Sequence, residues 1–117
     1  MTKIDQTALQ NLLQLIGGDK PSLVALIESF LTEGPVLVET LLSAQTDHDL
    51  ESIRRAAHTL KSSARDFGAM ELGSCCATLE AQCKANQVID IDHQVSQISS
   101  EFNAIRNELQ TFAAELV

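Results

Sequence analysis

His58 is the side chain whose surroundings in this sequence are best suited to chemistry. The segment from Leu50 to Ala64 has the apolar spacing of a helix. At roughly 100° per residue, His58 lies roughly 120° from the middle of the buried side, so we expect an exposed imidazole. Lys61 and Ser62 lie one turn further along the same flank. An accessible imidazole beside an ammonium group and a small hydroxyl is suited to accept an anionic group such as phosphoryl.

Basic residues are concentrated around this histidine. Four of the chain's 8 lysines and arginines lie in the same predicted helix: Arg54, Arg55, Lys61 and Arg65. Arg54 and Arg65 share the flank of His58, so we expect them to support a bound anion or a docking partner. The same arginines are equally well explained as solvated charges on a helix surface.

No motif in the sequence supplies the other parts of an enzyme active site. No serine or cysteine belongs to a hydrolase motif, and no Walker A or GxGxxG loop is present, since Gly17 and Gly18 follow a predicted helix rather than a strand. The cysteines and histidines lack the spacing of metal ligands. We therefore expect no cofactor or metal site and no autonomous kinase activity, so the phosphoryl group must come from another protein.

Helical periodicity extends over the whole chain and predicts an all-α fold. The five predicted helices begin near Asp5 or Thr7, Asp19, Asp47 or Asp49, Ala69, and Asp90 or Asp92. Gly34 and Pro35 interrupt the second helix, where we expect a kink rather than a break because the apolar stripe resumes in phase. Its predicted buried side is Leu23, Leu26, Ile27, Phe30, Leu31, Leu37, Leu41 and Leu42. The helices predict one domain over residues 1–117, an antiparallel four-helix bundle with a short extra N-terminal helix.

Composition restricts the classes of partner. The chain has 16 acidic and 8 basic residues, a net charge of -8 at pH 7, which repels nucleic acid and anionic membranes. The N-terminus lacks the apolar core of a signal peptide, and we find no membrane-spanning run. We therefore expect a cytoplasmic protein that binds neither nucleic acid nor membrane.

One stretch of the sequence resembles a known family. The run Ala-His-Thr-Leu-Lys-Ser-Ser-Ala at 57–64, followed by Phe-Gly-Ala at 67–69 and Leu-Glu at 79–80, resembles the signature of histidine phosphotransfer (HPt) domains. The match covers the third and fourth predicted helices. Within the family, the Ala-Asn-Gln segment at 85–87 is similar to free-standing phosphorelay proteins of the LuxU type.

The resemblance implies a role for each residue of the signature. His58 would be phosphorylated at Nε2, and Lys61 would neutralise the phosphoryl oxygens. Ser62 stands where many members have glycine, and this position must be small to admit a partner domain. Glu80 stands where relatives carry a polar group that orients the imidazole, although a carboxylate there would alternatively repel phosphate.

The resemblance also implies a function and partners. Such a protein accepts a phosphoryl group from the receiver-domain aspartate of a hybrid sensor kinase and passes it to the receiver domain of a response regulator. The partner receiver supplies Mg²⁺. We expect a bacterial, monomeric relay protein.

Two other functions remain compatible with the residues alone. The first is a catalytically silent helical adaptor that binds partners through its acidic surface. The second is the dimerisation and phosphoacceptor domain of a sensor kinase, which usually has an acidic residue directly after the histidine and a proline a few residues on. Thr59 and Ser63 do not fit that pattern.

Overall fold

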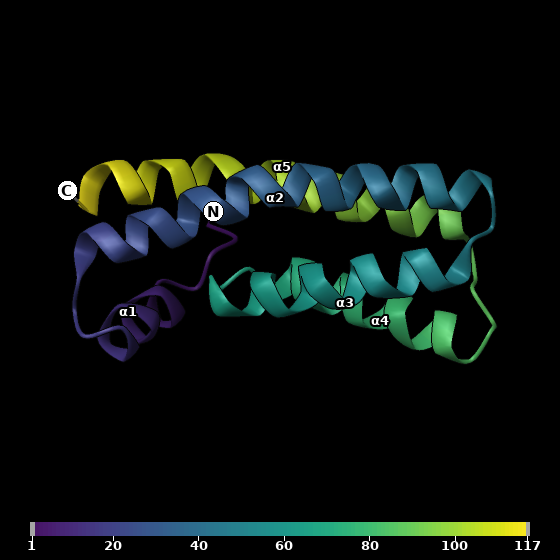
Figure 1. The fold of residues 1–117 in the computed structure, drawn as a ribbon, viewed down its shortest axis with the longest axis horizontal. Coiled ribbons are helices and arrows are strands. Elements are labelled where there is room, and N and C mark those ends of the chain that lie inside the picture. Colours follow the sequence, from purple (N-terminus) through teal and green to yellow (C-terminus); the bar gives the residue numbers. More distant parts are fainter. Residues whose placement is uncertain (1, 117) are drawn as a thin grey trace.

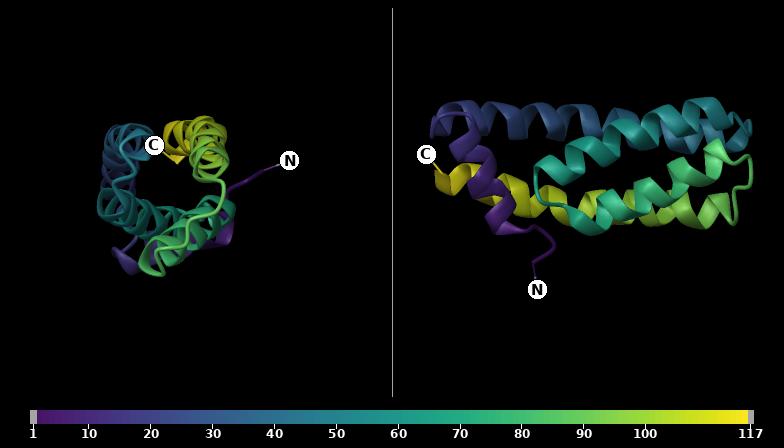
Figure 2. Two further views of the ribbon diagram at one scale, coloured as in Figure 1. Left: turned by 90° about the vertical axis from the view of Figure 1, so that its right-hand side faces the viewer. Right: turned by 90° about the horizontal axis from the view of Figure 1, so that it is seen from below.

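The computed structural model describes residues 2–116, which form five helices (Figure 1). They are α1 (Gln6–Leu15), α2 (Lys20–Thr46), α3 (Leu50–Asp66), α4 (Met70–Lys84) and α5 (Ile91–Leu116). An end-on view shows α2 to α5 around one central axis, with α2 and α5 side by side (Figure 2). The sequence-based prediction of an all-α bundle with a short N-terminal helix is confirmed.

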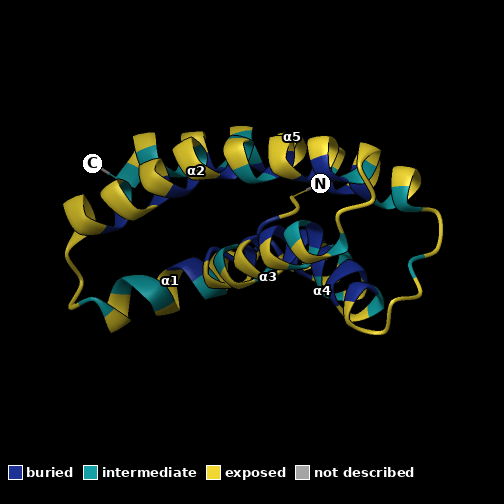
Figure 3. Ribbon diagram, turned by 45° about the vertical axis from the view of Figure 1, so that its right-hand side comes forward, coloured by how far each residue is buried: buried dark blue, intermediate teal, exposed yellow. Residues whose placement is uncertain are grey.

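The length of the helices explains the position of α1. α2 and α5 have 27 and 26 residues, whereas α3 and α4 have 17 and 15. The two long helices therefore extend beyond the short ones at one end. There α1 packs beside them and takes the place that α3 and α4 leave open (Figure 1). Buried residues line the inward sides of the helices and exposed residues line the outer sides (Figure 3).

Helix starts follow the capping residues in the sequence. Asp5 accepts a hydrogen bond from the amide of Thr7 at 2.9 Å, and Asp49 accepts one from the amide of Ser52 at 3.2 Å. Asp49 also accepts the Ser52 hydroxyl at 2.6 Å. Of the two alternatives predicted at each of these starts, Asp5 and Asp49 are the caps.

α2 continues through Pro35 as one helix, so the predicted interruption is not a break. Gly34 is buried against the ring of Phe102 on α5, and a β-carbon at this position would overlap that ring. The glycine therefore allows the two long helices to approach closely.

The predicted buried side of α2 is partly wrong. Leu26 and Leu42 are 41% and 38% exposed, whereas Gly34, Val38 and Ala44 are buried. The side of α2 that faces the core is thus rotated away from the side that carries Leu26 and Leu42. Which side of a broad apolar stripe is buried depends on where the neighbouring helices cross it.

A cluster of aromatic rings supports the C-terminal end of α3. Phe30 stacks on Phe67 with ring centroids 5.0 Å apart, and it forms a T-shaped pair with Phe102 with centroids 5.6 Å apart. Just after Phe67, Gly68 has a φ of +80° and its carbonyl accepts the amide of Asp5 at 2.9 Å. The helix that carries His58 is therefore fixed at this end by Phe30 of α2 and by the N-terminal segment.

Among the described helices, α2 is long and apolar enough to cross a membrane by length and composition. Core helices of soluble proteins meet the same criterion. In this bundle Leu23, Ile27, Phe30 and Leu41 of α2 are buried in the core.

Candidate functional site

Close packing of α3 against α4 brings the site residues together. Gly73 of α4 is buried, and a β-carbon there would lie 3.2 Å from Cγ of Arg65 on α3. The glycine thus leaves room for the arginine side chain between the helices. This packing brings His58 and Lys61 of α3 within reach of Glu80, in the C-terminal half of α4.

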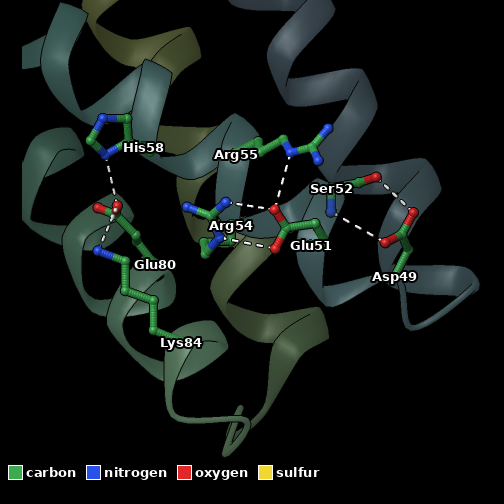
Figure 4. Close-up of polar contacts among 8 residues, drawn as sticks. All are labelled: Asp49, Glu51, Ser52, Arg54, Arg55, His58, Glu80 and Lys84. Carbon is green, nitrogen blue, oxygen red and sulfur yellow. Dashed lines mark hydrogen bonds and ion pairs between the residues drawn. The ribbon is translucent and has the colours of Figure 1, made fainter.

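His58 projects outward from α3 and contacts a buried carboxylate of α4. Its side chain is 56% exposed, as the helical periodicity predicted. Its Nδ1 lies 2.7 Å from Oε2 of Glu80, a residue that is 3% exposed (Figure 4). An ionised carboxylate can only accept hydrogen bonds, so Nδ1 carries the proton. In the neutral imidazole this leaves the lone pair on Nε2, the nitrogen directed away from Glu80.

Lys61 holds Glu80 in its charged form. Lys61 Nζ donates to Oε1 at 2.6 Å, and Lys84 Nζ lies 3.4 Å from Oε2. The hydrogen bond from Lys61, assisted by that from His58, outweighs burial and lowers the pKa of Glu80 from 4.5 to about 2. In the structure the Glu80 carboxylate contacts Nδ1 and not Nε2, the nitrogen to which the resemblance assigns the phosphoryl group.

Two of the arginines expected around His58 are paired with a carboxylate of their own helix. Arg54 forms a two-pronged contact with Glu51, with Nε at 3.1 Å and Nη2 at 2.6 Å from its oxygens, and Arg55 Nε lies 3.1 Å from the same carboxylate. These arginines lower the pKa of Glu51 to about 2. Helical periodicity placed Arg54 on the flank of α3 that carries His58, but its charge is offset by Glu51 on the preceding turn (Figure 4).

The other predicted site residues occupy different places. Ser62 is exposed, one turn from His58 along α3. Arg65 packs over Gly73, two turns from His58, and makes no ion pair with any residue from 2 to 116. Lys61 is mostly buried and already paired with Glu80.

Sequence reasoning missed Lys84. Glu80 and Lys84 are spaced i, i+4 on α4, an arrangement that favours an ion pair. The i, i+4 spacing could have predicted the ion pair, but only the contact of Glu80 with His58 makes Lys84 part of the site. Among residues 2–116, no cluster of three histidine, cysteine or acidic side chains is arranged to hold a metal ion.

The geometry thus presents a nucleophilic nitrogen to solvent and fixes the opposite nitrogen on a buried carboxylate. A model of the Hpt domain matches residues 25–115. The chain belongs to the Hpt domain family. The resemblance noted in the run at 57–64 is thereby confirmed, and histidine phosphotransfer in two-component signalling is the activity of this Hpt domain.

Two known proteins are similar to this Hpt domain over nearly its whole length. The phosphorelay protein LuxU of Vibrio harveyi is 27% identical over 109 residues, which cover 93% of this chain and 94% of LuxU. The crystal structure of histidine-containing phosphotransfer protein B (HptB) from Pseudomonas aeruginosa PAO1 superposes with a TM-score of 0.87. The sequence identity is 20%, with 96% of this chain and 95% of HptB covered, so this likeness supports the fold.

Proposed function

We propose that this protein is a phosphorelay intermediate whose His58 accepts a phosphoryl group from the receiver domain of a hybrid sensor kinase. It then passes the group to the receiver domain of a response regulator. The observation that carries the proposal is the contact between Nδ1 of the exposed His58 and the buried Glu80 carboxylate. The likeness to a phosphorelay protein over 93% of the chain supports the same role.

The chemistry follows from the tautomer of His58. The Nε2 lone pair attacks phosphorus, the bond from phosphorus to the aspartyl oxygen breaks, and the aspartate leaves with the electron pair. No proton has to be removed from Nε2, because the ring proton is on Nδ1. The product ring is cationic, and the Glu80 carboxylate 2.7 Å from Nδ1 stabilises that charge. The same step in reverse returns the group to the second receiver.

Charge neutralisation is divided between the partners. Lys61 lies one turn from His58, and the incoming phosphoryl group competes with Glu80 for its ammonium. Mg²⁺ bound by the receiver would supply further positive charge for the phosphoryl oxygens. Ser62 is small enough to leave space above the imidazole for the receiver. In this proposal Arg54 and Arg65 do not contact the phosphoryl group. Arg54 is paired with Glu51 and Arg65 packs over Gly73, so both shape the surface on which the receiver docks.

An apolar patch on α1 and α2 is the docking surface in this proposal. Leu15 and Leu26 are 82% and 41% exposed, and Leu26 lines a groove that also includes Leu12 of α1 and Ser63 of α3. The α3 side of this groove begins at Ser63, between one and two helical turns beyond His58. The relay acts as a monomer in the bacterial cytoplasm, where both receivers are present.

The test is phosphoryl transfer from a labelled receiver domain with Mg²⁺ to wild type and to His58→Gln. We expect label on the wild type only, in an acid-labile and base-stable form. A silent adaptor would acquire no label from any receiver, with its helical fold confirmed by circular dichroism. Sedimentation of the wild type checks the monomeric state.

A further inference from the structure

A groove between the C-terminal half of α2 and the start of α3 takes no part in the contacts of His58 and Glu80. Its volume is about 660 Å³. No basic side chain lines it, and its lining includes Pro35, Val36, Glu39, Ala44, Asp47 and Asp49. The side chain of Val36 is 64% exposed, so the groove presents apolar surface beside its carboxylates.

Two of the three carboxylates in the groove have no charged partner among the described residues, whereas Asp49 is acted on by the charge of Arg55. Asp49 is engaged by Ser52, but Glu39 and Asp47 form no ion pair or side-chain hydrogen bond with any residue between 2 and 116. Asp47 is also the C-cap of α2, whose last turn has no basic residue. The C-terminal end of a helix carries partial negative charge that a cation commonly offsets. Two carboxylates and a helix end therefore give this groove a negative potential.

We propose that this acidic groove binds a lysine or arginine side chain of the receiver domain that docks at His58, with an apolar neighbour of that residue resting on Val36. The inference rests on the proposed relay function and adds a contact that selects the partner. A receiver with an acidic residue at this position is repelled by Glu39 and Asp47.

The separation between the groove and His58 fits a single docking event. Ser52 lines the groove and precedes His58 by six residues on α3, which is about 9 Å along the helix axis. Arg55 lies exposed between them (Figure 4). A typical interface covers about 800 Å² on each partner, a disc roughly 30 Å across. One receiver centred near the imidazole therefore reaches both places.

The experiment measures label transfer from phosphorylated receiver domains, taken as a panel from the source genome, to the full chain carrying Glu39→Lys and Asp47→Lys. The matched control carries Glu28→Lys and Glu115→Lys, two exposed residues on α2 and α5 away from the groove. Both pairs change the net charge from -8 by the same amount. Lysine at the end of α2 is compatible with its helix dipole, and circular dichroism checks the fold.

We expect the groove pair to raise the KM for the phosphorylated receiver at least about tenfold with kcat within about twofold, and to weaken the salt dependence of KM. The control pair should change KM less than about twofold. Equal KM values for the two pairs would overturn the groove contact and leave the relay function standing. A change in self-association of the groove pair, without a change in KM, would instead assign the groove to a second copy of this chain. Failure of the wild type to accept label from every receiver would overturn both the contact and the relay.

Discussion

Replacing Glu80 tests the central element of the site, the carboxylate beneath the imidazole. Glu80→Gln keeps an oxygen that can accept the Nδ1 proton but removes the charge, whereas Glu80→Ala removes both. Because His58 becomes cationic as it accepts the phosphoryl group, the loss of charge should slow transfer more than it weakens receiver docking.

The magnitude follows from the type of hydrogen bond. A hydrogen bond to a charged group contributes about 1.5–3 kcal/mol, and a neutral one about 0.5–1.5 kcal/mol. The difference between the midpoints of these ranges, about 1.2 kcal/mol, corresponds to about an eightfold lower rate for Glu80→Gln. Glu80→Ala loses the whole interaction and should transfer roughly 30- to 100-fold more slowly.

The assay is single-turnover transfer at saturating receiver, with Glu51→Gln as the matched control. Glu51 also has a pKa of about 2 and lies on α3, but its partners are Arg54 and Arg55 rather than His58. Nitrogen NMR of His58 at alkaline pH should show the proton on Nδ1 in wild type and a loss of that preference in Glu80→Ala. A wild-type ring protonated on Nε2, or a Glu80→Gln rate equal to that of the control, would refute the assignment of Glu80.

Three further predictions concern charge, acid stability and packing. Lys61→Ala should slow single-turnover transfer at least about tenfold by removing the cation next to the phosphoryl oxygens, and an unchanged rate would exclude that role. The free energy of unfolding should fall as the pH drops from about 4.5 toward 2, because Glu80 has a lower pKa in the folded state and its contribution is complete only above the unfolded value. Stability measured by thermal unfolding should depend less on pH across this window in Glu80→Gln than in Glu51→Gln, because the Glu51 side chain is 54% exposed. Equal pH dependence in the two variants would contradict the buried ion pair. Gly34→Ala should lower the free energy of unfolding by about 1–2 kcal/mol, since overlap with Phe102 exceeds the gain in helix propensity, and a stabilised variant in urea unfolding would show that the two helices separate easily.

Local signals predicted much of the fold and the reactive residue. Caps such as Asp5 and Asp49 act on amides two or three residues away, so their effect is visible in the sequence. The exposure of His58 depends on the 100° rotation within its own helix, which the apolar neighbours of α3 define.

Contacts between helices do not follow from periodicity, and only the family resemblance suggested that Glu80 orients the imidazole. The bond between His58 and Glu80 joins residues 22 positions apart, and it requires the close approach of α3 and α4 at Gly73. The exposure of Leu26 and Leu42 likewise depends on which neighbours cover α2. Periodicity gives the direction of a side chain from its own axis but not the identity of the group it meets.

The buried carboxylate next to His58 limits the ways in which the phosphorylated protein can be imitated. Aspartate at position 58 would place its negative charge near the site of Nδ1, where Glu80 now accepts a proton at 2.7 Å. Two carboxylates at such a distance repel each other, so one of them takes up a proton or the side chain turns away. An acidic replacement would therefore disturb α3 and α4 without presenting charge where phosphate is carried. A stable analogue of the phosphorylated form has to keep the imidazole ring and carry its anionic group on the outer nitrogen.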